Sequence, residues 1–260
     1  MQVSEELVCG KYYHIYNRGI NSCNLFRETA NYQHFLSLLN KYVTPVAETF
    51  AWVLMPNHFH CLIKIRENMF YKYSIADKAK DPKWFEDNKW ETICVPPDLS
   101  ALADLSSCAD LSAGAAPDSV CLNKKINIPS RQQNPKLTTK LPAPHLHFSH
   151  LFNSYSKHFN NQYERHGALF ERPFSRKPVD SEAYLKKLII YIHNNPVHHG
   201  FCSHPEDYRW SSYLDFLNEN PTIVEREKVI ALFGNVVDFT LMHTNRKGNE
   251  NIDIEDWLGI

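Results

Sequence analysis

Apolar and polar residues follow two different periods over the first part of the chain. The aromatic and β-branched run 12–16 (YYHIY) leads into an Asn-Arg-Gly turn at 17–19, which predicts a strand that ends there. Residues 50–54 and 58–65 are strand-like runs on either side of a Met-Pro-Asn turn, so we expect a hairpin. Between these strands, apolar residues at three- and four-residue spacing predict a helix that ends before Pro45: Tyr32, Phe35, Leu36, Leu39 and Tyr42.

This periodicity is lost between residues 68 and 143. Many of the prolines fall at 95–145, where a stretch biased toward Ser, Ala, Asp and Leu contains the tripeptide DLS three times. We interpret 68–143 as a mostly irregular insertion with one short helix near Trp84–Trp90. The DLS copies indicate local repeat expansion, not a folded repeat array.

A helical period returns at His145. One apolar stripe predicts a helix that ends near Gly167: Phe148, Leu151, Phe152, Tyr155, Phe159 and Tyr163. A basic extended segment follows at 169–179 (LFERPFSRKPV). The next helix is expected to be capped by Asp180 or Ser181 and to end at Asn195, because proline follows.

Two weaker helical segments are expected further along, a short one that opens at 210–213 and another over 224–233. The pattern therefore divides the chain into three parts. They are an ordered part made of 1–67 and 144–217, the insertion 68–143, and an acidic C-terminal extension, 218–260.

Charge is unevenly distributed, although the formal net charge of the whole chain is only −1. Residues 122–200 hold 12 Lys and Arg against 4 Asp and Glu, a net charge of +8, whereas residues 1–121 and 201–260 carry −3 and −6. The basic block indicates either a surface that faces a polyanion or an ordinary solvated face. A histone-like polycation is excluded.

Glycine and cysteine exclude further classes of protein. Only 8 glycines occur and no two lie within five residues of each other, so glycine-rich loops that cradle a nucleotide cofactor are excluded. The 7 cysteines are scattered without a C-x-x-C pair, which argues against a disulfide framework or a thiolate zinc site. Without a signal peptide or a run of 18 apolar residues, we expect a soluble, cytoplasmic protein with no membrane partner.

His58 and His60 lie two residues apart on a predicted strand, so both side chains leave the same face. Two adjacent imidazoles can supply two nitrogens to one metal ion, while Phe59, Cys61 and Ile63 take the opposite, core-facing side. A chance pair is the other interpretation, because the chain has 14 histidines and a second His-x-His at 145–147.

The helix predicted over 181–195 presents a phenol and, one turn later, a carboxamide on one stripe: Tyr184, Leu188, Tyr191 and Asn195. A tyrosine hydroxyl can attack phosphorus when a cation lowers its effective basicity. Asn195 can offer a neutral oxygen to the same metal ion. The alternative is that Tyr191 only fills the boundary of the core.

Four segments together resemble one family, in the order in which that family has them. MPNHFHCLI (55–63) resembles the HUH motif of the IS200-like, single-tyrosine (Y1) transposases, and YIHNNPVHHG (191–200) resembles their nucleophile helix. YYHIYNRG (12–19) is similar to their first strand, and PEDYRWSSYLDF (205–216) resembles the REP-associated tyrosine transposase subgroup. Two features depart from the family pattern: His198-His199 stands where a basic and a small residue are usual, and the insertion is long.

The resemblance implies an α+β fold with a ferredoxin-like antiparallel sheet, helices packed on it and a long irregular insertion. It implies that His58, His60 and Asn195 hold a divalent metal ion and that Tyr191 cleaves single-stranded DNA at palindromic hairpins. Cleavage would leave a 5′-phosphotyrosine and a free 3′-hydroxyl, so that strand joining can follow by reversal. Ligand softness alone suits manganese or zinc, whereas the resemblance implies Mg²⁺ or Mn²⁺. It also implies a monomer or a homodimer.

Candidate DNA contacts are Arg18, Arg172, Arg176, Lys177 and Lys187. If 169–177 is extended, the two arginines share one face with Phe170 and Phe174, where phosphates and stacked bases can bind, and Lys177 lies on the other face. Arg18 matches the family's Asn-Arg-Gly turn, and Lys187 lies on the tyrosine helix. The alternative interpretation is that the phenylalanines belong to the core and that the cations are only solvated.

Two other functions stay open from the sequence. A domesticated hairpin-binding protein without turnover would need damage outside the His, Tyr and Asn residues, for example in the insertion. A zinc-dependent hydrolase would need a general-base carboxylate, and no Asp or Glu lies between Phe50 and Lys64.

Overall fold

A computed structural model of the chain describes residues 5–67, 69–74, 91–94, 137–140 and 142–244. The chain forms two compact units, one made of residues 1–65 and 144–260 and the other of residues 66–143. Each unit is described by itself. No helix of the described ranges is both long and apolar enough to cross a membrane.

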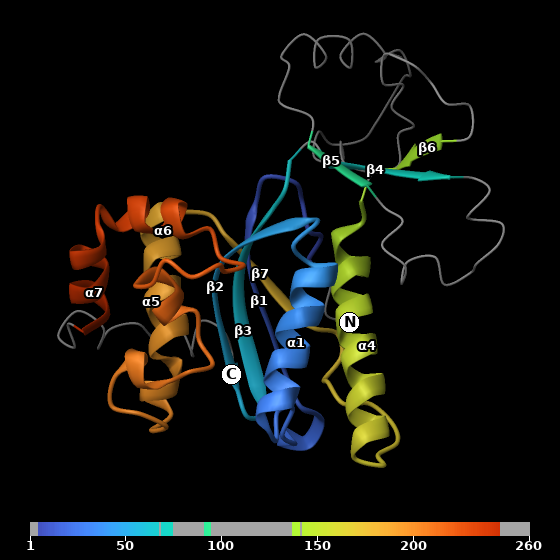
Figure 1. The fold of residues 1–260 in the computed structure, drawn as a ribbon, viewed down its shortest axis with the longest axis horizontal. Coiled ribbons are helices and arrows are strands. Elements are labelled where there is room, and N and C mark those ends of the chain that lie inside the picture. The colour runs from blue at the N-terminus through green and yellow to red at the C-terminus, as the bar shows by residue number, and fades with distance from the viewer. Residues whose placement is uncertain (1–4, 68, 75–90, 95–136, 141, 245–260) are drawn as a thin grey trace, which may run out of the picture. The chain divides into compact units, whose positions relative to one another are not determined.

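The larger unit is built on a four-stranded sheet in the order β2-β3-β1-β7, in which every neighbouring pair is antiparallel (Figure 1). The strands are β1 (Tyr12–Arg18), β2 (Ala47–Met55), β3 (His58–Ile65) and β7 (Ser175–Val179). The central strands β1 and β3 pair from Tyr12 with Lys64 to Arg18 with His58. The predicted hairpin is confirmed as β2 and β3, and its second strand has the predicted bounds.

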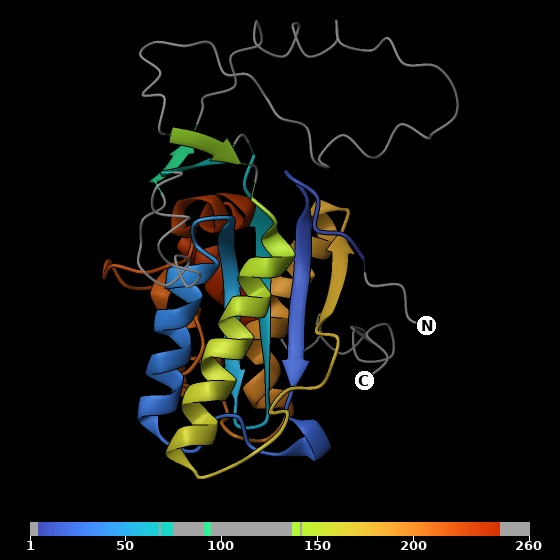
Figure 2. The ribbon, with the colours of Figure 1, turned by 90° about the vertical axis from the view of Figure 1, so that its right-hand side faces the viewer.

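Two helices connect these strands and cover one face of the sheet. They are α1 (Thr29–Tyr42), between β1 and β2, and α4 (Pro144–Gln162), which precedes β7. Both views show them side by side on this face (Figures 1 and 2). The chain order β-α-β-β-α-β with this strand order is the ferredoxin-like arrangement, so the predicted α+β fold is confirmed.

The core on this face is aromatic. Phe59 of β3 lies with its ring centroid 5.1 Å from that of Phe35 on α1 and 5.7 Å from that of Phe152 on α4. Phe35 and Phe59 are buried. Because side chains alternate along a strand, the neighbours of Phe59 in the sequence, His58 and His60, leave the opposite face.

The opposite face is covered by α5 (Glu182–His198), which lies across the sheet from α1 and α4 (Figure 1). Ser181 caps the helix, because its Oγ accepts a hydrogen bond of 3.2 Å from the Tyr184 amide. The prediction that the helix ends at Asn195 was wrong, since Pro196 lies inside the last turn and the helix continues to His198. Proline removes one intrahelical hydrogen bond there, and the His199 amide still donates to the Asn195 carbonyl.

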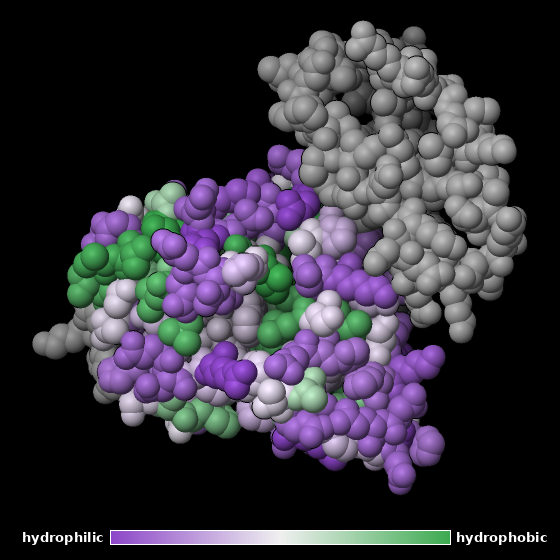
Figure 3. Space-filling model, viewed as in Figure 1, coloured by the Kyte–Doolittle hydropathy of each residue, from purple (hydrophilic) through white to green (hydrophobic). Residues whose placement is uncertain are grey.

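Two C-terminal helices pack beside α5: α6 (Arg226–Phe233), which was predicted, and α7 (Val236–Thr244), which was not. Phe239 of α7 is fully buried, and its ring centroid lies 5.9 Å from that of His193 on α5. The described part of the acidic C-terminal segment is therefore packed on the same side of the sheet as α5. Apolar side chains nevertheless gather on the surface over α7 (Figure 3). The exposed apolar residues of this helix are Val236, Val237, Leu241 and Met242. Three short 3₁₀ segments complete the unit: η1 (Ile20–Ser22), η2 (Pro205–Asp207) and η3 (Tyr213–Phe216).

The smaller unit contains an antiparallel sheet in the order β5-β4-β6. Its strands are β4 (Met69–Ser74), β5 (Glu91–Cys94) and β6 (Leu137–Lys140). The sequence predicted a mostly irregular insertion and missed these three strands, which are short and far apart in the chain. The helix expected near Trp84–Trp90 and the DLS repeats lie outside the described residues.

Candidate active site

Strand β3 places His58 and His60 under α5, at the centre of the sheet. Their ring centroids lie 5.2 Å apart with the planes at 81°. His60 is 2% exposed, whereas His58 is partly exposed. The sequence predicted that both rings share the less apolar face, and the strand confirms the shared face. It did not predict that α5 buries that face.

Helix α5 brings the phenol and the carboxamide to the same place. The ring of Tyr191 lies edge-on to that of His60, with the centroids 5.7 Å apart. One turn later, Asn195 Oδ1 lies 3.1 Å from His58 Nε2. Tyr191 and Asn195 are both buried. The structure therefore brings together the four side chains that the sequence singled out as nucleophile and metal ligands.

His58 has two hydrogen-bonding contacts, one at each ring nitrogen. Burial lowers the pKa of His58 to about 4, against a smaller opposing effect of the Asn195 hydrogen bond, so the ring is neutral at pH 7 and carries one N–H. His58 Nδ1 lies 2.7 Å from the acceptor Asn57 Oδ1, which is the shorter of its two contacts. The proton is either on Nε2, which then donates to Asn195 Oδ1, or on Nδ1, which then donates to Asn57 Oδ1 and leaves the lone pair of Nε2 directed at Asn195.

The resulting donor set fits a divalent cation. With the proton on Nδ1, His58 Nε2 and Asn195 Oδ1 are two electron-pair donors 3.1 Å apart, and a cation bound by both would remove their repulsion. Neighbouring ligands of an octahedral Mg²⁺, each at about 2.0–2.1 Å, are about 2.9 Å apart. The buried Nδ2 of Asn195 has no hydrogen-bond partner among the described residues, so the carboxamide contacts His58 through its oxygen. The Nδ1–H of His58 held by an amide oxygen is also the usual support of a ligating histidine.

This donor set consists of two imidazoles and one amide oxygen. Within the ranges that the structure describes, no group of three or more His, Cys, Asp or Glu could hold a metal ion. A cation bound by His58, His60 and Asn195 would keep several positions for water or phosphate oxygens. Such partly hydrated coordination is typical of Mg²⁺ at phosphate-processing sites.

Sequence reasoning missed a third histidine in this cluster, His14 of β1. His14 Nε2 lies 3.0 Å from His60 Nδ1, and the two rings stack with their centroids 5.1 Å apart. Burial lowers the pKa of His14 to about 3 and that of His60 well below its usual value, so both rings are neutral. The alternation in YYHIY places His14 and Tyr16 on one face of β1. Only the pairing of β1 with β3 shows that this face carries His58 and His60.

The two histidines that depart from the family pattern lie at the open side of the cluster. The His199 ring centroid lies 5.3 Å from that of His58, and the His198 ring centroid lies 6.1 Å from that of Tyr191. Both side chains are exposed. His198 is the last residue of α5 and His199 is its C-cap, so both border the site from the helix that carries the tyrosine.

The candidate DNA-contacting cations divide between the two faces of the sheet. Arg18, at the end of β1 opposite His58, lies 3.6 Å from the Glu171 carboxylate and donates to Ser22 Oγ. Lys177 pairs with His14 across β1 and β7, and its charge is one of the causes that lower the pKa of that histidine, after burial. Lys187 is exposed on α5. Arg18 and Lys177 therefore lie beside the histidine cluster, on the α5 side of the sheet.

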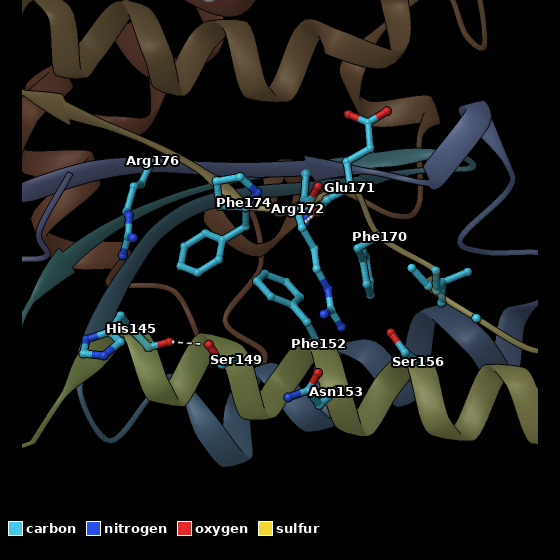
Figure 4. Close-up of a pocket in the computed structure, with 15 residues that line it drawn as sticks. His145, Ser149, Phe152, Asn153, Ser156, Phe170, Glu171, Arg172, Phe174 and Arg176 are labelled. Carbon is cyan, nitrogen blue, oxygen red and sulfur yellow. Dashed lines mark hydrogen bonds between the residues drawn. The ribbon is translucent and has the colours of Figure 1, made fainter. Parts of the chain in front are cut away.

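Arg172 and Arg176 lie on the other face, in a groove between α4 and the segment 167–176 (Figure 4). Arg176 pairs with Ile15, whose side chain leaves the face opposite to that of His14. The expectation that Arg172 and Arg176 share one face with Phe170 and Phe174 is met, since all four line the groove. The sheet separates them from Tyr191, which could not be foreseen without the strand order.

The groove has a volume of about 700 Å³ and combines aromatic rings with cations. The Phe152 ring lies 5.1 Å from that of Phe170 and 5.2 Å from that of Phe174, by centroids. The Arg176 guanidinium lies 4.9 Å from the centre of the Phe174 ring, and its buried Nε has no hydrogen-bond partner in the described part of the chain. Figure 4 shows Arg172 and Arg176 extending toward α4, while Glu171 points away. Polar groups of α4 complete the lining: His145, Ser149, Asn153 and Ser156.

Comparisons with known proteins add little to these observations. No protein-family model and no curated protein matches the sequence. Among solved structures, one described as the REP associates tyrosine transposase bound to a REP hairpin is similar to this chain, with 14% sequence identity and a TM-score of 0.46. The match covers 85% of this chain and 88% of that one. The chemistry of the site therefore rests on its own residues.

Proposed function

We propose that the protein is a metal-dependent endonuclease and strand transferase for single-stranded DNA, a transposase-type enzyme that acts at hairpins and uses Tyr191 as its nucleophile. The observation that carries this proposal is the contact between two elements distant in the chain. Tyr191 and Asn195 lie one turn apart on α5 and meet His60 and His58 on β3. All four side chains come from one chain, which supports an enzyme complete as a monomer.

The residues supply the parts that phosphoryl transfer needs. His58, His60 and Asn195 would hold Mg²⁺ or Mn²⁺, which when bound supplies charge stabilisation at a phosphate oxygen. The Tyr191 hydroxyl forms the new oxygen–phosphorus bond and loses its proton, while the bond from phosphorus to the 3′-oxygen breaks and that oxygen is protonated. One phosphodiester replaces another, so the reverse reaction joins strands without an external energy source.

The positions of the cations suggest how DNA is held. Lys177 and Arg18 lie beside the histidine cluster, and Lys187 is exposed on the helix that carries Tyr191; all three are proposed to bind phosphates of the strand that is cleaved. Arg172 and Arg176 are proposed to bind phosphates on the other face, where Phe174, the partly exposed Phe ring of the groove, offers a stacking surface for an unpaired base; Phe152 and Phe170 are buried. Lys177 and Arg176 are neighbours on the edge strand β7 with side chains on opposite faces, so a strand that passes around this edge can contact both.

A covalent-adduct assay tests the nucleophile. Single-stranded hairpin oligonucleotides, labelled at the 5′ end or at the 3′ end, are incubated with the full chain and Mg²⁺ or Mn²⁺. The proposal predicts an adduct on the fragment that keeps the 3′ label, and its loss in Tyr191→Phe. Tyr184→Phe, on the same helix, is the matched control and should keep the adduct.

The same assay separates the other functions. Hairpin binding without cleavage or adduct, in the presence of metal, would favour a domesticated binding protein. Cleavage that survives Tyr191→Phe and leaves no adduct would favour a zinc-type hydrolase. That chemistry has little support here, because no Asp or Glu is among the causes that shift the pKa of His58 or His60.

A further inference from the structure

His14 occupies a position that couples it to one proposed metal ligand. It is 0% exposed, and among the described residues its hydrogen-bonding contact joins its Nε2 to His60 Nδ1 at 3.0 Å. Its other ring nitrogen, Nδ1, is buried without a hydrogen-bond partner among the described residues. The ring also stacks between strand neighbours, 4.9 Å from Tyr16 and 5.1 Å from His60 by centroids.

Two arrangements of protons satisfy the bond between these neutral rings. In the first, His14 Nε2–H donates to His60 Nδ1, and the proton of His60 is on Nε2. In the second, His60 Nδ1–H donates to His14 Nε2, and the proton of His14 is on its buried Nδ1. A buried N–H without a partner is more costly than a buried nitrogen lone pair, so the first arrangement is favoured when no metal is bound.

Metal binding requires the second arrangement. His60 already uses Nδ1 toward His14, so Nε2 is the nitrogen left for a metal ion, and it must carry a lone pair. The proton of His60 must then be on Nδ1 and must be accepted by His14. Both rings therefore change tautomer together, and His14 is left with an unpartnered N–H.

We infer that His14 is a positioning residue that holds the tautomer and orientation of His60 and couples both to metal occupancy. The inference rests on the proposed metal site at His58, His60 and Asn195. His14 is not itself placed in the donor set; it acts through the hydrogen bond to His60. Removal of a residue that hydrogen-bonds to a metal ligand commonly lowers metal affinity by about 10- to 100-fold.

Three variants of the full chain separate this role from packing. His14→Phe keeps a stacked ring and removes the hydrogen bond, so Mn²⁺ affinity, measured by electron paramagnetic resonance, should fall by about 10- to 100-fold. His14→Gln offers an amide oxygen to His60 Nδ1–H without a second ring to rearrange, so affinity should be at least that of the wild type. His158→Phe is the control, because His158 is exposed on α4. Circular dichroism verifies that each variant is folded.

Nitrogen-15 NMR of the imidazoles gives a readout that packing alone would not move. On addition of Mg²⁺ to the wild-type chain, His14 and His60 should both change from the Nε2–H to the Nδ1–H form. In His14→Gln, His60 should hold the Nδ1–H form before metal is added. If the wild-type chain binds Mn²⁺ and His58→Ala weakens that binding, the proposed metal site stands. Unchanged Mn²⁺ affinity in His14→Phe would then overturn the inference about His14 and leave the metal site in place. Absence of Mn²⁺ binding by the wild-type chain would overturn the proposed metal site, and the inference with it.

Discussion

Asn195 Oδ1 lies 3.1 Å from His58 Nε2, although 137 positions separate the two residues in the chain. The contact joins the last turns of the tyrosine helix to the strand that carries both histidines. It also fixes where Tyr191 lies, because Tyr191 precedes Asn195 by one helical turn. A carboxamide that only stabilised the fold would not need to leave its buried Nδ2 without a partner.

Substitutions of Asn195 should show whether its side chain binds a metal ion or only stabilises the fold. Asn195→Asp keeps the shape and adds a negative charge, so Mn²⁺ should bind more tightly. Asn195→Leu removes the oxygen and should weaken Mn²⁺ binding by at least tenfold, while the thermal midpoint of unfolding reports the cost of the lost hydrogen bond. Titration calorimetry measures the affinities. Equal Mn²⁺ affinity in all three chains would show that Asn195 is not a ligand.

Acid should destabilise the protein through buried neutral histidines outside the site. His147 on α4 is 4% exposed and donates from Nδ1 to the Tyr42 carbonyl at 2.7 Å. Burial, opposed by that hydrogen bond, lowers its pKa to about 4, so the unfolded chain takes up a proton at higher pH than the folded chain. The stability that depends on neutral His147 is complete above pH 6.5 and is lost as the pH falls toward 4.

Urea unfolding of His147→Gln and of the wild type at pH 7.5 and pH 5 measures this effect. The acid-induced loss of free energy of unfolding should be smaller in the variant by about 2 kcal/mol. Exposed His158→Gln should leave the loss unchanged. An identical loss in His147→Gln and the wild type would mean that His147 does not stay neutral in the folded chain.

Much of the fold followed from the sequence because its strands and helices have clear periods. The bounds of strand β3 were predicted correctly because a turn precedes the strand and apolar residues fill it. Helix α7 was missed because it is apolar around most of its circumference and shows no helical stripe. The strands β4 to β6 were missed because their pairing partners are distant in the chain, and pairing is a tertiary property.

The candidate site was predictable to the extent that local geometry decides it. Alternation placed His58 and His60 together, and helical spacing placed Tyr191 and Asn195 together. The role of His14 depends on the register between β1 and β3, which no local pattern reveals. The separation of Arg176 from the tyrosine by the sheet depends on the order of the strands.

The groove should contribute to DNA affinity without contributing to the chemical step. Arg172→Ala and Arg176→Ala should each weaken binding of single-stranded DNA and lower the dependence of log K on log salt by about 0.7, since each loses one phosphate contact. The rate of adduct formation at saturating DNA should stay unchanged. Lys228→Ala removes the same charge from a surface pair with Glu48 and serves as the control. An unchanged salt dependence in both arginine variants would show that the groove does not bind DNA phosphates.

The C-terminal helix α7 should be part of the folded unit. Phe239 is fully buried against α5, α6 and η3, so Phe239→Ala should cost about 3–5 kcal/mol of unfolding free energy. Val237→Ala on the same helix is the matched control, because Val237 is 67% exposed and its change should stay within about 0.5 kcal/mol. Equal, small effects of the two changes in urea unfolding would show that α7 does not contribute to the core.

Peptide mass spectrometry after reaction with an unlabelled hairpin oligonucleotide tests the central claim most directly. The full chain is incubated with the DNA and Mn²⁺, digested with nuclease and protease, and searched for a nucleotide phosphate bound to a side chain. We predict the modification on Tyr191, through the 5′-phosphate of the cleaved strand, with none on Tyr184. Cleaved DNA with an unmodified Tyr191, or a phosphate bound to another residue, would contradict the assignment of Tyr191 as the nucleophile.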